Sequence, residues 1–176
     1  MIRALVCGID QHSTSWQGMI VSNTADGIGL CGTVQEADNV LDVLAEYGLE
    51  RRNQELDVYM MCEIPSNVVL ADQFGKRFDG FSIGTNDLTQ LVLGVDRDAE
   101  ELSYLFDERN EAVKRMVTDL IDTDHSDDTK VGICGQAPSD YPNFAAFLVE
   151  HGIDSISLNP DSVIEVKRRV GEQENA

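Results

Sequence analysis

A short polar run follows an apolar segment near the middle of the chain and has the residue types of a ligand site. Residues 81–83 read as a short buried strand, Gly84 is a turn residue, and Thr85, Asn86 and Asp87 open a run with helical spacing. In α/β proteins, ligands bind on the loops after the carboxyl ends of the strands. Asp87 could bind a metal, and the N–H groups at the helix start could bind an anion. The alternative is that Thr85 or Asn86 only caps the helix, and the sequence leaves both interpretations open.

Three further polar residues directly follow predicted strands: Glu63, Cys134 and Asn159. If the strands are neighbours, these residues lie at one edge of the sheet. Glu63 and Asp87 could then share a Mg²⁺ ion, because hard oxygen ligands suit that ion. Cys134 could transfer a proton. Arg97, in the loop after the central helix, could bind a phosphate through its guanidinium group.

Each of these residues also has an ordinary structural interpretation. Glu63 could be a favourable charge at a helix N-terminus, Arg97 could belong to a surface ion pair, and Cys134 could be a small core side chain. The coincidence of polar residues at four predicted strand ends nevertheless favours a ligand site.

The elements that must position these residues alternate between strand-like and helix-like segments, which predicts a parallel sheet or barrel of the α/β class. Thr33 and Glu36 have the spacing of a capping box at the start of the first helix. The predicted strands are 56–62, 81–83, 130–134 and 153–158, and the predicted helices are 33–46, 65–74, 85–92, 102–106, 111–121, 141–151 and 160–170.

Length and composition predict one domain with a hydrophobic core, since the chain has 176 residues of which 42% are hydrophobic. No apolar run is long enough to span a bilayer. The apolar run at the N-terminus is interrupted by Asp10 and is too short for a secretory signal. We therefore expect a cytoplasmic protein. The cysteines lack the spacing of disulfide or metal motifs, so we expect Cys7, Cys31, Cys62 and Cys134 to be thiols.

The formal net charge is −19, from 32 acidic and 13 basic residues. This excess opposes nucleic-acid binding and would repel anionic substrates unless a cation screens them. Because the acidic residues are spread along the whole chain, we hypothesise a halophilic source, whose proteins stay soluble in strong salt. The alternative is an ordinary acidic protein.

The chain divides into three segments by pattern. Residues 1–29 show no clear periodicity and are interpreted as an irregular, unassigned N-terminal segment. Residues 30–170 contain the alternating strands and helices and form the predicted domain. Residues 171–176 are expected to be a frayed tail.

Several longer motifs, in order along the chain, are similar to those of a known enzyme family. They are EIPSN at 63–67, FSIGTNDLTQ at 81–90, VDRD at 95–98, GICGQ at 132–136 and SISLNP at 155–160. Together they resemble the C-terminal barrel of the PEP-utilising enzymes, which include phosphoenolpyruvate synthase, pyruvate phosphate dikinase and enzyme I of the sugar phosphotransferase system. Residues 134–140 are most similar to the phosphoenolpyruvate synthase branch, because the other two usually have glutamate where Gln136 stands.

The resemblance implies the C-terminal half of a (β/α)8 TIM-type barrel with about four βα units. In the family, a phosphohistidine on a separate domain passes its phosphoryl group to pyruvate enolate, which gives phosphoenolpyruvate. The implied site residues are Glu63 and Asp87 for Mg²⁺, Gly84, Thr85, Asn86 and Arg97 for the substrate, and Cys134 for removal of the methyl proton.

The family's full enzyme has parts that this sequence does not match: the ATP-binding domain, the phosphohistidine domain and the first half of the barrel. His12, His125 and His151 do not lie in a phosphohistidine-like context. We therefore expect a fragment or split subunit whose partners are pyruvate or phosphoenolpyruvate and a chain carrying the missing parts, or a homo-oligomer. The alternatives are a non-catalytic pseudo-enzyme, a domain of the dikinase or enzyme I type, and a free-standing Mg²⁺-dependent lyase-like half barrel.

A half barrel leaves strand edges exposed, and exposed edges pair with other chains. We expect Val58, Met60, Phe81 and Ile133 to face the barrel interior and to need cover from the missing strands. The chain is therefore expected to form a dimer or larger assembly, or to need a partner. The alternative is that residues 1–29 fold back and seal one edge.

Overall fold

The central element is a six-stranded sheet with the strand order β1-β2-β5-β6-β7-β8. The computed structural model describes residues 4–5, 17–20, 22–24, 27–29, 31–51, 57–96, 99, 101–124 and 129–174. The strands span Ala4–Leu5, Gln17–Ile20, Asp57–Cys62, Gly80–Ile83, Lys130–Ile133 and Ser155–Ile156. All neighbours from β2 to β8 pair in parallel, and β1 pairs antiparallel with β2. The four strands predicted from the sequence are thus the consecutive neighbours β5 to β8.

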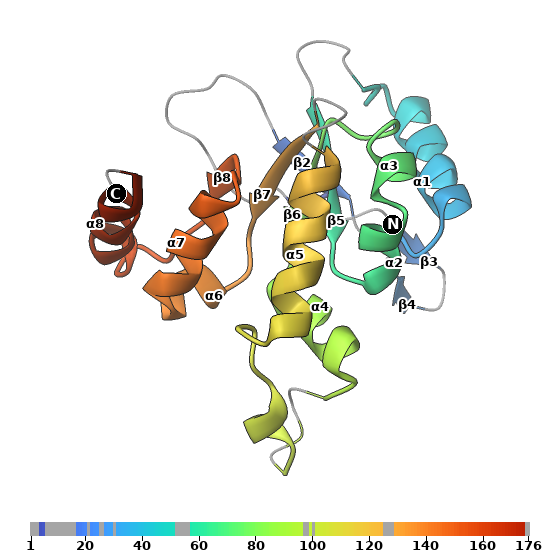
Figure 1. The fold of residues 1–176 in the computed structure, drawn as a ribbon. Coiled ribbons are helices and arrows are strands. Elements are labelled where there is room, and N and C mark those ends of the chain that lie inside the picture. Colours follow the sequence, from blue (N-terminus) through green and yellow to red (C-terminus); the bar gives the residue numbers. More distant parts are fainter. Residues whose placement is uncertain are drawn as a thin grey trace.

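Helices connect these strands along the outside of the sheet. They are α1 (Val34–Glu46), α2 (Pro65–Val69), α3 (Ala71–Phe74), α4 (Thr85–Leu93), α5 (Glu111–Asp124), α6 (Ala137–Asp140), α7 (Pro142–Glu150) and α8 (Val163–Glu174), with a 3-10 turn η1 (Ser103–Leu105). Figure 1 shows α5 in front of the sheet, α1 and α3 to one side and α7 and α8 to the other. In this view α2, α4 and α6 begin at the lower end of the sheet, where β5, β6 and β7 end. Parallel strands with connecting helices form a partial (β/α)8-type barrel, as expected.

The N-terminal residues differ from the irregular segment expected for 1–29. β1 and β2 extend the sheet beyond β5, and β3 (Ser22–Thr24) and β4 (Gly27–Gly29) form a separate antiparallel pair. The structure therefore supports the alternative in which this segment adds to one edge of the sheet. Strands of two to four residues are too short to produce a periodic pattern, and β2 joins the sheet through its pairing with β5.

Helix boundaries near the site follow from local sequence. Thr33 Oγ1 accepts a hydrogen bond from Glu36 N at 3.2 Å, and Glu36 Oε2 accepts one from Thr33 N at 3.0 Å, which confirms the predicted capping box. Pro65 is the first residue of α2, as expected. Gly94 ends α4 with φ of 63°, a left-handed conformation that glycine adopts without strain.

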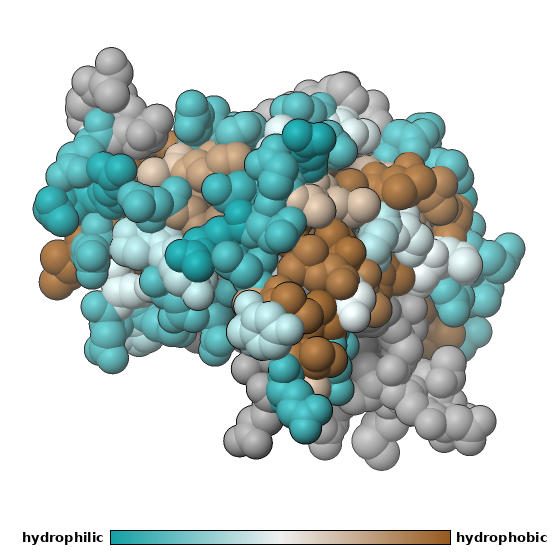
Figure 2. Space-filling model, turned by 60° about the horizontal axis from the view of Figure 1, so that its bottom comes forward, coloured by the Kyte–Doolittle hydropathy of each residue, from teal (hydrophilic) through white to brown (hydrophobic). Residues whose placement is uncertain are grey.

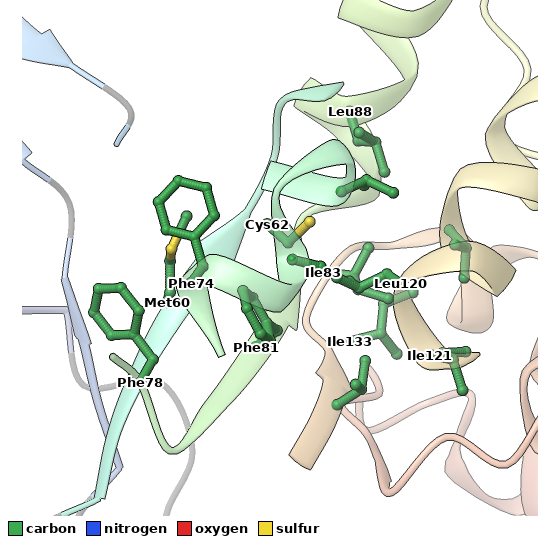
Figure 3. Packing of buried hydrophobic residues seen from close by; sticks show 14 of the residues in the cluster. Met60, Cys62, Phe74, Phe78, Phe81, Ile83, Leu88, Leu120, Ile121 and Ile133 are labelled. Carbon is green, nitrogen blue, oxygen red and sulfur yellow. The ribbon is translucent and has the colours of Figure 1, made fainter. Parts of the chain in front are cut away.

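One face of the sheet and the helices outside it form the hydrophobic core. Met60 is in register with Phe81, and both side chains are at most 2% exposed. Figure 3 shows these side chains near Phe74, which comes from α3, and Ile83 and Ile133 near Leu120 of α5. Removal of this much apolar surface from water is the main stabilising term of the domain.

The expectation that Val58, Met60, Phe81 and Ile133 face the barrel interior is wrong. All four are buried in the cluster that includes helix side chains, so they lie on the outer, helix-covered face. Side chains alternate between the two faces of a strand. A period of two identifies the residues that share a face, but it leaves open which face the helices cover.

The opposite face of the sheet has one large side chain above a small one. Tyr59 is in register with Gly80, and its ring occupies the space in which a Cβ on Gly80 would collide with it. Burial, followed by the charges of Asp57, Asp154 and Asp79, raises the pKa of Tyr59 to about 12. The phenol is therefore neutral and fills the inner face near the amino ends of the strands.

Two aspartates set the register at the amino ends of the strands. Asp79, just before β6, accepts a hydrogen bond from Val58 N at 2.8 Å and donates its own N–H to Val58 O at 2.8 Å. Asp154, just before β8, makes the same two bonds with Val131, at 2.8 and 2.9 Å. Asp79 also accepts from Arg51 Nε at 2.6 Å. Each aspartate therefore extends the strand pairing through its side chain.

Replacement of Asp79 by alanine is expected to lower the free energy of unfolding by about 2–3 kcal/mol, because it removes charge-assisted hydrogen bonds to Val58 N and Arg51. Chemical denaturation measures this change. The matched control is Asp72→Ala, since that carboxylate is 57% exposed and lies 3.9 Å from Lys76 Nζ, and it should cost no more than about 0.5 kcal/mol. Equal losses in the two variants would contradict the role assigned to Asp79.

The C-terminal elements differ from the predicted boundaries. β8 has two residues, and α8 begins at Val163 and continues to Glu174, beyond the expected start of the frayed tail. Within α8, Ile164 is 85% exposed, whereas Val166 is buried. Glu172 receives ion pairs from Arg168 and Arg169, at 2.9 and 3.2 Å, which support the last turns of α8. Among the described helices, none has the length and apolar character needed to cross a bilayer.

Candidate functional site at the carboxyl ends of the strands

The ends of β5, β6 and β7 are in direct contact. Glu63, the residue after β5, folds over Gly84, the residue after β6, so that a Cβ on Gly84 would lie 2.5 Å from Glu63 Oε1 and 2.6 Å from Glu63 Cγ. Gly84 N donates to Cys62 O at 3.0 Å, and Cys134 N donates to Ile83 O at 3.0 Å. The strand pairing thus continues to the carboxyl ends and brings three predicted site residues to one edge. A larger residue at position 84 would therefore displace the Glu63 side chain from this place.

A buried amide holds the turn that carries Glu63. Asn67 is 1% exposed, and its Oδ1 accepts hydrogen bonds from Glu63 N at 3.2 Å and Ile64 N at 3.3 Å. Its Nδ2 donates to Cys31 O at 2.7 Å, in the segment that precedes α1. The backbone of Glu63 is therefore fixed from two sides, which limits the directions that its carboxylate can take.

Thr85, predicted to bind the substrate, has its side chain buried beside Gly135, the residue after Cys134. A Cβ on Gly135 would collide with Thr85 Oγ1 and would lie 2.8 Å from Thr85 N. The Thr85 side chain is fully buried. The N-cap of α4 is Gly84, and no side chain makes a capping hydrogen bond there, so the alternative that Thr85 or Asn86 caps the helix is wrong. Because the hydroxyl is buried, a ligand could meet only the backbone of Thr85.

Asn86 and Asp87 are the second and third residues of the nine-residue helix α4, and both are half-buried. The N–H groups in the first turn of a helix lack intrahelical acceptors, and the helix dipole favours a negative ligand there. This turn follows Gly84, over which the Glu63 carboxylate lies. The strand ends therefore present two carboxylates together with a set of N–H donors.

Cys134 is the residue after β7 and is half-buried. Its Sγ lies 3.7 Å from Ile83 O and 3.8 Å from Met61 Sδ. Cys62, in contrast, is fully buried within the hydrophobic core. The described cysteines, Cys31, Cys62 and Cys134, are all thiols, as predicted, whereas Cys7 lies outside the described residues. The position of Cys134 at the strand end favours the chemical interpretation over that of a core side chain.

The remaining two predicted residues are placed differently. Arg97 lies outside the described residues, so its proposed contact with phosphate stays a prediction. Asn159 is exposed on the turn between β8 and α8. Its N–H donates to Ser139 Oγ at 2.9 Å, and its carbonyl accepts from Ser162 Oγ at 2.9 Å. Asn159 thereby ties the end of β8 to α6, which is a structural role.

Glu108, which no sequence pattern distinguishes, lies between η1 and α5 and is only 6% exposed. Burial raises the pKa of its carboxyl group, the Thr85 hydroxyl lowers it, and the charges of Asp140 and Asp107 raise it further. The residue belongs to a polar loop without periodicity, so only the tertiary structure identifies it as a buried acid beside α4.

The donor set at the strand ends fits a hard cation. Glu63 and Asp87 each offer carboxylate oxygens, and Mg²⁺ is commonly held by one or two carboxylates together with waters and substrate oxygens. In the part of the chain that the structure describes, no group of three or more histidine, cysteine, aspartate and glutamate side chains is arranged to hold a metal ion.

Most of the chain is similar in sequence to known proteins. The family profile described as "PEP-utilising enzyme, PEP-binding domain" matches residues 28–175. A phosphoenolpyruvate synthase of Aquifex aeolicus is 58% identical over 156 residues, which cover 89% of this chain and 18% of that protein. A phosphoenolpyruvate synthase of Escherichia coli is 52% identical over 147 residues, which cover 84% of this chain and 19% of that protein. The chain thus spans less than a fifth of the length of these relatives.

Solved structures support the fold. A pyruvate kinase from Cryptosporidium parvum is similar with a TM-score of 0.58 at 12% identity, over 88% of this chain and 31% of that one. A citrate synthase variant is similar with a TM-score of 0.53 at 13% identity, over 95% of this chain and 67% of that one. At these identities the likeness concerns the arrangement of strands and helices alone.

Proposed function

Because the chain belongs to the PEP-utilising enzyme family, through its PEP-binding domain, we propose that it is the part of a phosphoenolpyruvate synthase that binds pyruvate or phosphoenolpyruvate. The observation that carries this proposal is the contact of Glu63 with Gly84, at the start of the helix that bears Asp87. It brings a carboxylate to a helix N-terminus suited to an anion. In the full enzyme, ATP, pyruvate and water would give phosphoenolpyruvate, AMP and phosphate.

The proposed cofactor is Mg²⁺, held by Glu63 and Asp87. When bound, it would supply positive charge that stabilises the negative charge developing on the oxygens of the oxo acid. Asn86 and the N–H groups at the start of α4 would bind and orient the carboxylate or phosphate of the ligand. Gly84 would leave room for the ligand beside the backbone, and Arg97 would bind the phosphate.

Cys134 is the proposed acid and base. Its thiolate would take a proton from the methyl group of pyruvate on the way to phosphoenolpyruvate, and the thiol would return it in the reverse direction. The sulfur lies beside Met61 Sδ and Ile83 O, at the end of β7. Among the described residues at the three joined strand ends, only the two proposed metal ligands offer another group that could transfer a proton.

Calorimetric titration of the chain with pyruvate, with and without Mg²⁺, tests this function. Binding is expected only when Mg²⁺ is present, because the two carboxylates would otherwise repel the anion. Lactate is the matched control ligand, since it keeps the carboxylate but lacks the keto oxygen, and it should bind more weakly. Pyruvate binding that is equally strong without Mg²⁺, or undetectable with it, would contradict the proposal.

The other steps of the full reaction would need parts outside this sequence. We propose that a partner chain, or another region of a longer protein, carries the ATP-binding domain, the phosphohistidine and the first half of the barrel. Figure 2 turns the lower end of Figure 1 forward and shows an apolar area bordered by hydrophilic residues on that face. Large apolar side chains of α4 and the following segment are exposed, namely Leu91, Leu102, Tyr104 and Leu105. Exposed apolar side chains of this kind commonly mark an interaction site. The alternatives to a partner that carries the missing parts are a homo-oligomer and a non-catalytic relative of the enzyme.

The charge of the chain leads to a separate proposal, that the protein is adapted to strong salt. The melting temperature is expected to rise with KCl concentration, because salt screens the repulsion among 32 acidic residues opposed by 13 basic ones. Thermal unfolding followed by circular dichroism measures this. Sucrose is the control, since it favours the compact state without screening charge. Greatest stability at low salt would exclude the proposal.

A further inference from the structure

Glu108 is a buried acid that forms no ion pair with the described residues. Its side chain lies in the segment between η1 and α5, and the residue is only 6% exposed. Among the described residues, its Oε1 has no hydrogen-bond partner. The neighbouring cation in the sequence, Arg109, pairs with Asp107 at 2.8 Å and stacks over the Tyr141 ring at 4.3 Å. A buried carboxyl group with an unsatisfied oxygen lowers the stability of the fold, which suggests that Glu108 has a function that offsets this cost.

The groups around Glu108 connect it to the candidate site. The Thr85 hydroxyl of α4 lies close enough to Glu108 to lower the pKa of its carboxyl group. Within the described residues this hydroxyl is also buried and satisfies no geometric hydrogen bond. Thr85 in turn packs against Gly135, the residue after Cys134. Asp140 of α6 and Asp107 of the same loop lie near enough to disfavour a negative charge on Glu108.

We propose that Glu108 is a positioning residue for the pyruvate site, which holds the first turn of α4 against the end of β7 through Thr85. A neutral carboxyl group can donate its O–H to Thr85 Oγ1, and this bond would satisfy two buried polar atoms at once. The ionised form has no proton to donate, and it would add negative charge behind a turn that must bind an anion. The expected effect of Glu108 on pyruvate affinity rests on the proposed function, whereas its effect on the position of α4 does not.

The proposal makes the site sensitive to pH in a defined direction. Burial raises the pKa of Glu108, and the charges of Asp140 and Asp107 act in the same direction, while the Thr85 hydroxyl opposes them. Below the pKa that glutamate has in the unfolded chain, the carboxyl group of Glu108 is fully protonated and its contribution to stability is at its maximum. Both the proton and this contribution are lost as pH rises through the raised pKa of the folded state. The position of the first turn of α4 should follow this titration.

Three variants of the full chain test the proposal through the amide resonances of Thr85, Asn86 and Gly135. Glu108→Gln keeps a neutral donor, so its resonances should match those of the wild type at acidic pH and should stay unchanged up to about pH 8. Glu108→Ala removes the donor and should shift these resonances at every pH. Glu111→Gln is the matched control, because that glutamate is exposed and pairs with Arg115 on the surface of α5, and it should change none of them.

Pyruvate affinity supplies the functional readout. With Mg²⁺ present, Glu108→Ala should weaken binding about tenfold, and Glu108→Gln should retain the affinity of the wild type at acidic pH but lose its decline at higher pH. If the wild type binds no pyruvate, the proposed function fails, while the amide resonances still decide the positioning role. If Glu108→Ala does not fold, Glu108→Gln decides it alone. Resonances that keep the pH dependence of the wild type in Glu108→Gln, or do not move in Glu108→Ala, would overturn the proposal.

Discussion

Replacement of Asp87 by asparagine is expected to abolish the Mg²⁺-dependent binding of pyruvate. The change keeps the shape of the side chain and its place in the first turn of α4, but it removes the negative charge that a hard cation needs. We expect the affinity for pyruvate in the presence of Mg²⁺ to fall by about 100-fold or more. Loss of a residue that only supports a metal ligand costs at most about 100-fold, and loss of a ligand itself should cost at least as much. Isothermal titration calorimetry provides the measurement.

Two further variants separate a metal ligand from a general charge effect. Glu63→Gln should cause a comparable loss, because Glu63 is the other proposed ligand. Asp72→Asn is the matched control, since Asp72 is likewise an acidic residue in the first turn of a helix, α3, but is exposed. Its affinity should be unchanged. Binding that survives in both Asp87→Asn and Glu63→Gln would remove the metal site from this account.

Replacement of Cys134 by serine is expected to stop the exchange of pyruvate methyl protons with solvent in the assembly that makes phosphoenolpyruvate. Serine keeps a side chain of similar shape at the end of β7 but is a far weaker acid, so proton transfer should slow by about 10²- to 10⁴-fold. Exchange is followed by the loss of the methyl signal in deuterated water by nuclear magnetic resonance. In the wild type, exchange should rise with pH, because the thiolate is the basic form.

The same Cys134→Ser variant should bind Mg²⁺ and pyruvate with normal affinity. Neither proposed ligand is altered, and Cys134 N still donates to Ile83 O through the backbone. Unchanged exchange in a variant that binds normally would show that another group moves the proton. Loss of binding would instead indicate that the thiol, with Met61 beside it, shapes the pocket.

The strands and helices that carry the site could be predicted because each has a strong local signal. The capping box of Thr33 and Glu36 defines the start of α1, and an apolar strand followed by Gly84 defines the turn into α4. The location of Glu63 and Cys134 at the carboxyl ends of strands could be predicted because each directly follows such a strand. In a parallel sheet, residues that directly follow neighbouring strands lie together at one edge of the sheet.

Other features depend on tertiary contacts that a local pattern does not contain. Phe81 belongs to a strand with two alternating faces, and only the packing of α3 and α5 decides which is the outer one. β2 is recognisable only through its pairing with β5. From the sequence Thr85 resembles a helix cap, but in the structure its side chain packs against Gly135. Glu108 resembles a surface residue, but in the structure it is buried. For these residues the decisive neighbour lies far away along the chain.

The most direct test of the central claim is to bind Mn²⁺ in place of Mg²⁺ in the presence of pyruvate and to record which amide resonances the paramagnetic ion broadens. The account predicts the strongest broadening at Glu63, Gly84 and the first turn of α4, with weaker effects at Cys134 and Gly135. This broadening should disappear in Asp87→Asn. Broadening centred on other acidic residues, or unchanged by Asp87→Asn, would contradict the claim that the ends of β5 and β6 form a metal-dependent site for pyruvate.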